Sequence, residues 1–146
     1  MKTASSELLL LDVNVLLAIA WPNHQFHSAA IAALSRRNRW ATCALTQLGF
    51  IRLSSNPAVV GAAKGPQQAV ALLADLVGDP LHVYLDSLPA PTSGEWRSAF
   101  AGLFGHQQVT DAYLLQLAAT HNAVLLTFDR RLESLSSSAA RVVILG

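Results

Sequence analysis

The segment Leu8–Leu17 reads Leu-Leu-Leu-Leu-Asp-Val-Asn-Val-Leu-Leu, and the fold can be worked out from the aspartate in its middle, Asp12. Four consecutive leucines between polar residues are typical of a short strand that is buried on both faces. Such strands occur mostly in parallel sheets that have helices above and below. Asp12 then stands where the strand ends, and open α/β sheets bind ligands at that edge. Asp12 could instead cap the following helix, because aspartate is a favoured N-cap residue.

Length and composition indicate one folded domain. The chain has 146 residues, of which 52% are hydrophobic and 13% charged, so we expect a single domain over residues 1–146 with a substantial core. Its apolar runs fall short of the roughly 18 residues that a membrane-spanning helix needs. We see no signal-peptide pattern, and the single cysteine, Cys43, cannot form an internal disulfide. We therefore expect a cytoplasmic protein that does not bind membranes.

The remaining sequence alternates between strand and helix patterns. Further strands are predicted at residues 39–44, 81–85, 123–128 and 142–145. Helices are predicted at residues 13–20, 24–37, 47–53, 67–77, 95–103, 110–119 and 130–135. Thr46 and Thr110 are the expected N-caps of two of these helices, and residues 54–65 are expected to be irregular. Alternating strands and helices predict an α/β fold with a parallel sheet flanked by helices on both faces, a three-layer α/β/α arrangement.

Two more aspartates are expected at the same edge of this sheet. Asp129 follows the strand at 123–128, and Asp111 lies at the start of the helix at 110–119. Carboxylates that share a site repel one another unless a cation lies between them. Oxygen ligands without His or Cys favour Mg²⁺ or Mn²⁺, and such an ion can activate water and offset charge on a phosphate. The pattern predicts a metal-dependent hydrolysis of phosphodiesters, although both aspartates could also serve only to stabilise helix starts.

Four segments in order along the chain carry a family pattern. They are Leu10–Leu17, Leu45–Arg52 with Ser55–Pro57, Val109–Leu114 and Leu126–Leu132. Together they resemble the PIN-domain ribonucleases, and most closely the single-domain toxins of the VapBC toxin–antitoxin type. The resemblance implies a Mg²⁺- or Mn²⁺-dependent endoribonuclease that is often a homodimer. It also implies a cognate VapB-like antitoxin whose C-terminal segment occupies the active-site groove.

The resemblance assigns roles to individual residues. The family's first, third and fourth acids correspond to Asp12, Asp111 and Asp129, which would be the catalytic and metal-binding residues. We expect Asp12 and Asp111 to hold the ion directly, and Asp129 to hold it through water or to orient the attacking water. Arg130 and Arg131 are expected to bind the RNA substrate through flanking phosphates, which position RNA without reading its sequence. Two polar family positions also have counterparts here, namely Asn14 and Thr127.

One position departs from the family pattern. The family's second acid, usually glutamate, falls at Gln47. An amide oxygen can still bind a metal ion or a water, but it brings no negative charge and cannot act as a base. We therefore expect Gln47 to line the acidic pocket and to weaken metal binding.

Other functions stay open at this point. A PIN-like module that binds RNA or a partner without cleaving is one, and Gln47 is the residue in its favour. A phosphatase of the haloacid-dehalogenase type also has a strand-end aspartate, but Asn14 stands where its second aspartate is usual, and Lys2 and Lys64 are poorly placed to clamp a phosphate. A metal site formed by His24 and His27 is conceivable, although exposed histidines near a helix start are the simpler interpretation.

Overall fold

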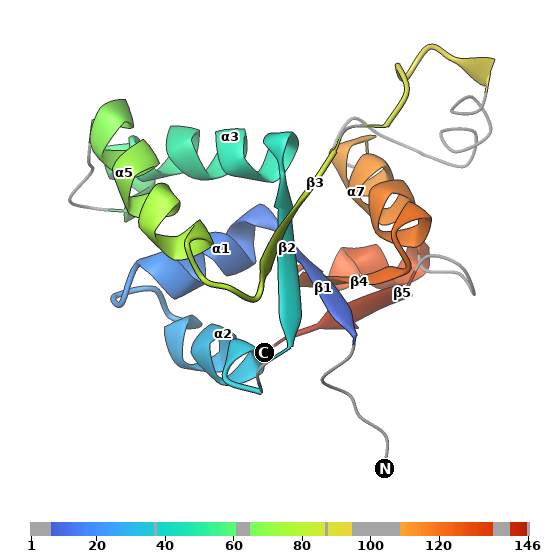
Figure 1. Cartoon of the computed structure of the whole chain (residues 1–146). Helices are drawn as coiled ribbons and strands as arrows, with labels where there is room; N and C mark the ends of the chain where they lie inside the picture. Colours follow the sequence, from blue (N-terminus) through green and yellow to red (C-terminus); the bar gives the residue numbers. More distant parts are fainter. Residues whose placement is uncertain are drawn as a thin grey trace.

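A parallel sheet forms the centre of the structure, a computed structural model that describes residues 7–36, 38–60, 65–86, 88–94, 109–135 and 141–145. Within these residues, five strands pair in the order β3-β2-β1-β4-β5, and every pairing is parallel (Figure 1). The strands are β1 (Leu8–Leu11), β2 (Arg39–Cys43), β3 (His82–Leu85), β4 (Ala123–Thr127) and β5 (Arg141–Ile144). The strand of four leucines is thus the central one, with a neighbour on each side.

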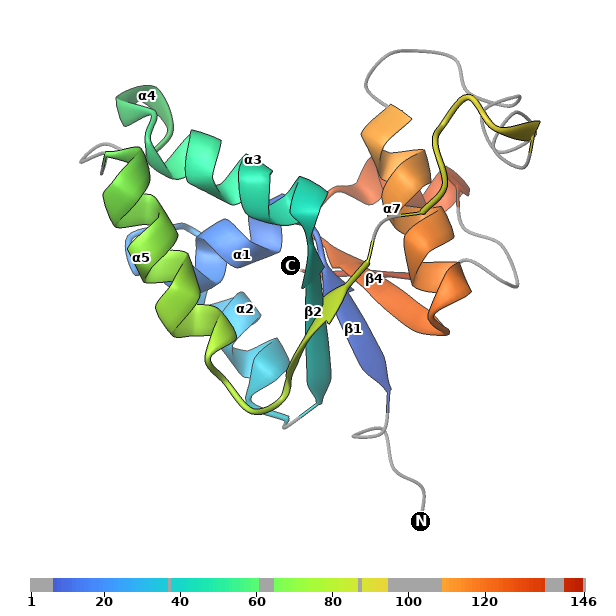
Figure 2. The same cartoon turned by 45° about the horizontal axis from the view of Figure 1, so that its top comes forward.

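Helices cover both faces of this sheet, as the sequence predicts. They are α1 (Val13–Ala20), α2 (His27–Leu34), α3 (Ala44–Ser54), α4 (Pro57–Val60), α5 (Pro66–Val77), α7 (Val109–Thr120) and the 3-10 helix η3 (Arg130–Leu135). Helices α1, α2, α3 and α5 lie on one side of the sheet, and α7 lies on the other (Figures 1 and 2). The three-layer α/β/α prediction is therefore confirmed. In the described part of the chain, no helix has both the length and the apolar content needed to cross a bilayer.

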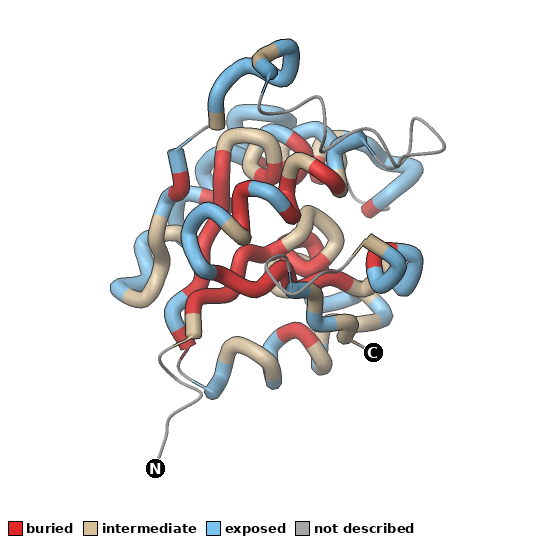
Figure 3. The backbone as a smooth tube through the Cα atoms, turned by 90° about the vertical axis from the view of Figure 1, so that its right-hand side faces the viewer, coloured by how far each residue is buried: buried red, intermediate tan, exposed pale blue. Residues whose placement is uncertain are grey.

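The two cores of the molecule are separated by the sheet, and β1 contributes to both. Leu8 and Leu10 pack with α7, whereas Leu9 and Leu11 pack with α1, α3 and α5. All four leucines are buried, and the buried residues follow the sheet through the middle of the molecule (Figure 3). Burying a leucine side chain contributes roughly 1.5–3 kcal/mol, so this segment is a main source of stability. It also fixes the position of Asp12 at the end of β1.

The start of α3 differs from the prediction. The helix begins at Ala44 directly after β2, with Cys43 as its N-cap. Thr46 lies inside the first turn, where its hydroxyl accepts a hydrogen bond from the Cys43 backbone N–H (3.0 Å) and donates one to the Cys43 carbonyl (3.1 Å). The prediction that Thr46 is the N-cap was wrong because its side chain bonds backward to the strand end. Strand and helix therefore follow each other without a turn.

Other boundaries shift as well. Helix α7 begins at Val109, so Thr110 lies within its first turn, and α2 is shorter than the predicted helix at 24–37. The stretch expected to be irregular contains α4, whose start is stabilised by a hydrogen bond from the Ala58 backbone N–H to the Asn56 side chain (2.9 Å). The helix predicted at 95–103 lies outside the described residues.

Candidate active site

Asp12 holds the central position of the candidate site. Its backbone N–H donates to the Leu126 carbonyl (2.9 Å), which continues the pairing of β1 with β4 by one residue. One carboxylate oxygen, Oδ1, accepts a hydrogen bond from the Val13 backbone N–H (2.8 Å) and so caps α1. The other oxygen, Oδ2, accepts one from the hydroxyl of Thr127 (2.7 Å). Asp12 is therefore both a helix cap and a strand-end carboxylate at the ligand-binding edge of the sheet.

Thr127 joins the ends of β1 and β4. Besides donating to Asp12, its hydroxyl oxygen accepts hydrogen bonds from Asn14 Nδ2 (3.3 Å) and from the Asp129 backbone N–H (3.1 Å). Asn14 Oδ1 in turn accepts from the Phe128 backbone N–H (3.4 Å). Thr127 is fully buried, so these bonds are shielded from water. The structure thus brings together Asp12, Asn14, Thr127 and the backbone of Asp129, which the family pattern had only aligned along the sequence.

The three predicted acids are close enough to influence one another electrostatically. Burial and, to a smaller extent, the charges of Asp12 and Asp129 together raise the pKa of Asp111 to about 6. Burial also raises the pKa of Asp12, an effect that the hydrogen bonds from Thr127 and Val13 oppose. The ends of β1 and β4 and the first turn of α7 therefore deliver their carboxylates to one cluster. Carboxylates that share a site disfavour one another's ionisation.

Asp129 is engaged by a neighbouring arginine. The guanidinium of Arg131 donates from Nε to Oδ1 (2.9 Å) and from Nη2 to Oδ2 (2.7 Å), and the Arg131 backbone N–H also donates to Oδ1 (3.0 Å). These bonds lower the pKa of Asp129. Both oxygens of Asp129 face Arg131. As arranged in the described residues, no group of three His, Cys, Asp or Glu side chains could hold a metal ion. Arg131 is expected at the substrate from the sequence, and its pairing with Asp129 is an additional contact, for which an arginine two residues after a turn aspartate is a signal.

Gln47 lies in the first part of α3 and is half-buried. Its amide nitrogen Nε2 donates a hydrogen bond to the hydroxyl of Thr42 (2.9 Å), a partner that sequence analysis did not suggest. Helix α3 passes close to the start of α1, because a Cβ added at Gly49 would lie 2.8 Å from a methyl group of Val13. Helix α3, which carries Gln47, therefore packs beside Val13, the residue after Asp12.

The two N-terminal histidines have separate partners. The Nδ1 atom of His27 hydrogen-bonds with the Ala18 carbonyl (2.6 Å). The Nδ1 atom of His24 accepts from the Phe26 backbone N–H (3.0 Å), and its ring stacks on Phe128. The simpler interpretation was that both histidines are exposed near a helix start. Instead, both rings are partly buried and make contacts at the start of α2.

An apolar groove opens beside the acidic cluster. It has a volume of about 360 Å³ and lies between the starts of α3 and α7. It is lined by Ala44, Leu45, Leu48, Pro91, Val109, Thr110 and Tyr113. Since Thr110 directly precedes Asp111, the groove adjoins the candidate site. Leu48 and Val109 are 66% and 46% exposed, so two large apolar side chains of the groove lining face solvent together.

Comparison with known proteins identifies the family. The chain belongs to the PIN domain family, which matches residues 9–137. It is 39% identical to Ribonuclease VapC39 of Mycobacterium tuberculosis (strain ATCC 25618 / H37Rv), covering 93% of this chain and 98% of that protein. It is 37% identical to Ribonuclease VapC38 of the same strain, covering 82% and 84%. The predicted PIN-domain resemblance is thus confirmed, and the haloacid-dehalogenase alternative falls away.

Solved structures agree with the fold. The chain is similar to a crystal structure of VapBC2 from Rickettsia felis bound to a DNA fragment from their promoter, with a TM-score of 0.64 at 14% identity, covering 95% of this chain and 99% of that one. It is also similar to DNA-bound VapBC from Salmonella typhimurium, with a TM-score of 0.61 at 15% identity, covering 94% and 98%. At such low identity, the likeness concerns the fold alone.

Proposed function

We propose that this protein is a metal-dependent endoribonuclease and the toxin of a type II toxin–antitoxin pair. The observation that carries this proposal is the placement of Asp12 after β1, Asp129 after β4 and Asp111 in the first turn of α7, at the carboxyl end of a parallel sheet. Curated relatives that match nearly their whole length are named ribonucleases, which supports RNA as the substrate. A cytoplasmic location belongs to the same proposal.

The donor set fits Mg²⁺ or Mn²⁺. It consists of carboxylate oxygens. Burial and, secondarily, the charges of Asp12 and Asp129 raise the pKa of Asp111 to about 6, and a bound cation would favour its ionised form. Asp12 and Asp111 would hold the ion directly. Mg²⁺ usually retains several waters, so two protein carboxylates suffice for a first shell. When bound, the ion supplies positive charge next to the scissile phosphate.

The remaining side chains have roles around that ion. Thr127 and Asn14 hold the Asp12 carboxylate in one orientation through the bonds described above. Asp129, whose pKa is lowered, stays ionised at neutral pH and would accept a hydrogen bond from the attacking water. Arg130 and Arg131 are exposed at the same edge and would contact phosphates on either side of the cleavage site.

Partners follow from the same proposal. A VapB-like antitoxin would block the site, and a second copy of the chain would form a homodimer. The apolar groove between α3 and α7 supports such contacts, because exposed apolar surface next to a site marks protein interaction surfaces.

The proposal is tested by cleavage of a structured RNA with Mg²⁺, with Mn²⁺ and with EDTA. We expect cleavage only with a divalent ion, and a loss of roughly 10²–10⁴-fold in the Asp12→Asn variant. Asp75→Asn is the matched control, because Asp75 is exposed on α5. Equal cleavage by the two variants, or cleavage in EDTA, would overturn the proposal. Binding of RNA without cleavage would favour the binding-module alternative.

A further inference from the structure

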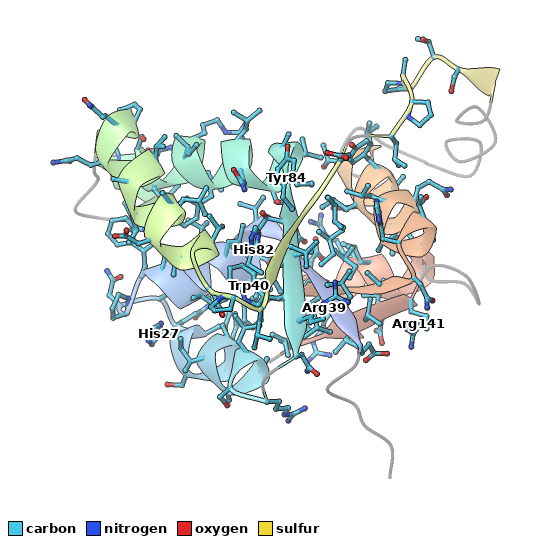
Figure 4. All side chains as sticks on the ribbon, viewed as in Figure 1. His27, Arg39, Trp40, His82, Tyr84 and Arg141 are labelled. Atoms are coloured by element: carbon cyan, nitrogen blue, oxygen red, sulfur yellow. The ribbon has the colours of Figure 1, made fainter. Side chains whose placement is uncertain are left out.

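Three polar side chains, on β2, β3 and α3, are connected by hydrogen bonds. The hydroxyl oxygen of Thr42, on β2, lies 2.9 Å from Nε2 of Gln47 on α3 and 2.8 Å from Nε2 of His82 on β3. Thr42 is fully buried. The rings of His82 and Trp40 are in edge contact, with 4.7 Å between their centroids. Both residues are labelled in Figure 4.

With the Gln47 amide nitrogen facing Thr42, the hydrogen-bonding capacity of these groups allows one arrangement in which every proton has an acceptor. A hydroxyl has one proton, whereas an amide nitrogen can only donate. The Thr42 oxygen therefore accepts from Gln47, and its own proton is available to His82. His82 must then present an unprotonated Nε2 and carry its proton on Nδ1. If His82 donated from Nε2 instead, Thr42 would accept both bonds and its buried hydroxyl proton would have no acceptor among the described residues, unless the Gln47 amide turned its oxygen toward Thr42.

Resting on the function proposed above, we propose that His82 and Thr42 are positioning residues that fix the orientation of the Gln47 amide. With its nitrogen bound to Thr42, Gln47 keeps its oxygen as the free end of the amide. An oxygen acceptor is what a hydrated cation can use, whereas an NH₂ group would repel it. These hydrogen bonds from His82 through Thr42 to Gln47, here called the relay, thus let a neutral amide serve at the position where the family usually has a glutamate.

The surroundings of His82 agree with an uncharged ring. Burial lowers the pKa of His82, and the nearby Asp79 carboxylate only partly opposes this effect. Asp79 is itself bonded to the indole N–H of Trp40 (2.9 Å). The neutral form is the one that can accept from Thr42 through Nε2.

The relay is tested by nitrogen NMR of the His82 ring, which distinguishes a protonated from an unprotonated Nε2. In the wild-type protein we expect the tautomer with its proton on Nδ1. In Gln47→Glu the carboxylate has no N–H to donate, so Thr42 donates to it and His82 must switch to the Nε2–H form. In Gln47→Ala the wild-type tautomer remains. A protonated Nε2 in the wild type, or no change in Gln47→Glu, would overturn the proposal.

A second measurement tests the consequence for cation binding. Thr42→Val keeps the shape of Thr42 but removes the hydroxyl, and we expect it to weaken binding of Mn²⁺ roughly 10-fold in a titration without RNA. Thr42→Ser, which restores the hydroxyl, should restore the affinity. Equal affinities of the two variants would refute the positioning role. A wild-type protein that shows the expected tautomers and Mn²⁺ affinities but cleaves no RNA would refute the proposed nuclease function and leave the relay standing.

Discussion

Neutralising Asp111 should stabilise the protein while removing its activity. Asp111 lies in the first turn of α7, half-buried beside two other carboxylates. Its pKa of about 6 in the folded protein, against an ordinary value of 3.8, means that the folded state resists ionising this group. Asp111→Asn removes the charge and keeps the size and shape of the side chain.

The size and pH dependence of the effect follow from that pKa. Between pH 3.8 and about 6 the folded state binds more protons at Asp111 than the unfolded state does, so the free energy of unfolding falls as pH rises through this window. Above about pH 6 the loss of stability caused by ionising Asp111 in the folded protein is complete. At about 1.4 kcal/mol per pKa unit the upper limit is about 3 kcal/mol. Solvent screening at a half-exposed side chain, and the lost favourable contact with the helix dipole, reduce it to about 1 kcal/mol.

Urea unfolding in EDTA at pH 4 and pH 8 measures the effect. We expect Asp111→Asn to raise the free energy of unfolding by about 1 kcal/mol at pH 8, or the Tm by roughly 2–4 °C, with little difference at pH 4. Mg²⁺ should then stabilise the wild type more than the variant. Asp129→Asn is the contrasting control, because its pKa is lowered and neutralising it should not stabilise. Destabilisation by Asp111→Asn at pH 8 would refute the picture of uncompensated charge.

Three further substitutions test other contacts. Thr127→Val removes the hydroxyl that donates to Asp12, so the pKa of Asp12 should rise. The acidic limb of the pH profile of cleavage should then move to higher pH, whereas Thr127→Ser, which keeps a hydroxyl, should not shift it. Gly49→Ala places a Cβ 2.8 Å from a Val13 methyl group, and we expect a net loss of about 1 kcal/mol by urea unfolding, whereas Gly94→Ala, where a Cβ meets nothing within 4 Å, should be neutral. Gln47→Glu adds a fourth carboxylate and should tighten Mn²⁺ binding in a titration; unchanged affinity would mean that position 47 does not face the ion.

The central strand and the edge that carries the acids were predictable from sequence. Four leucines require burial on both faces, and the two cores that β1 joins confirm this requirement. Parallel strands end at a common edge, so residues that follow two such strands lie at the same edge of the sheet. Asp12 and Asp129 could be placed at that edge for this reason, but not side by side.

The contacts that orient those acids were not predictable. The hydroxyl of Thr127 reaches Asp12 only because β4 pairs directly with β1, and strand order is not written in local sequence patterns. The bond between Thr42 and His82 spans 40 positions and depends on the register of β2 with β3. The pairing of Arg131 with Asp129 depends on side-chain conformation. Sequence patterns report burial and periodicity, whereas these bonds depend on long-range geometry.

The structural and catalytic interpretations of Asp12 are compatible in the structure. A carboxylate offers about four lone-pair sites, and the bonds from Val13 and Thr127 use one on each oxygen. The remaining sites stay available to a cation, and the two bonds hold the carboxylate in the orientation that such binding requires. Asp129 differs, since an exposed arginine holds both of its oxygens. Binding of an ion should therefore leave Asp12 in place and rearrange Asp129 with Arg131, which would free that guanidinium for a phosphate of the RNA.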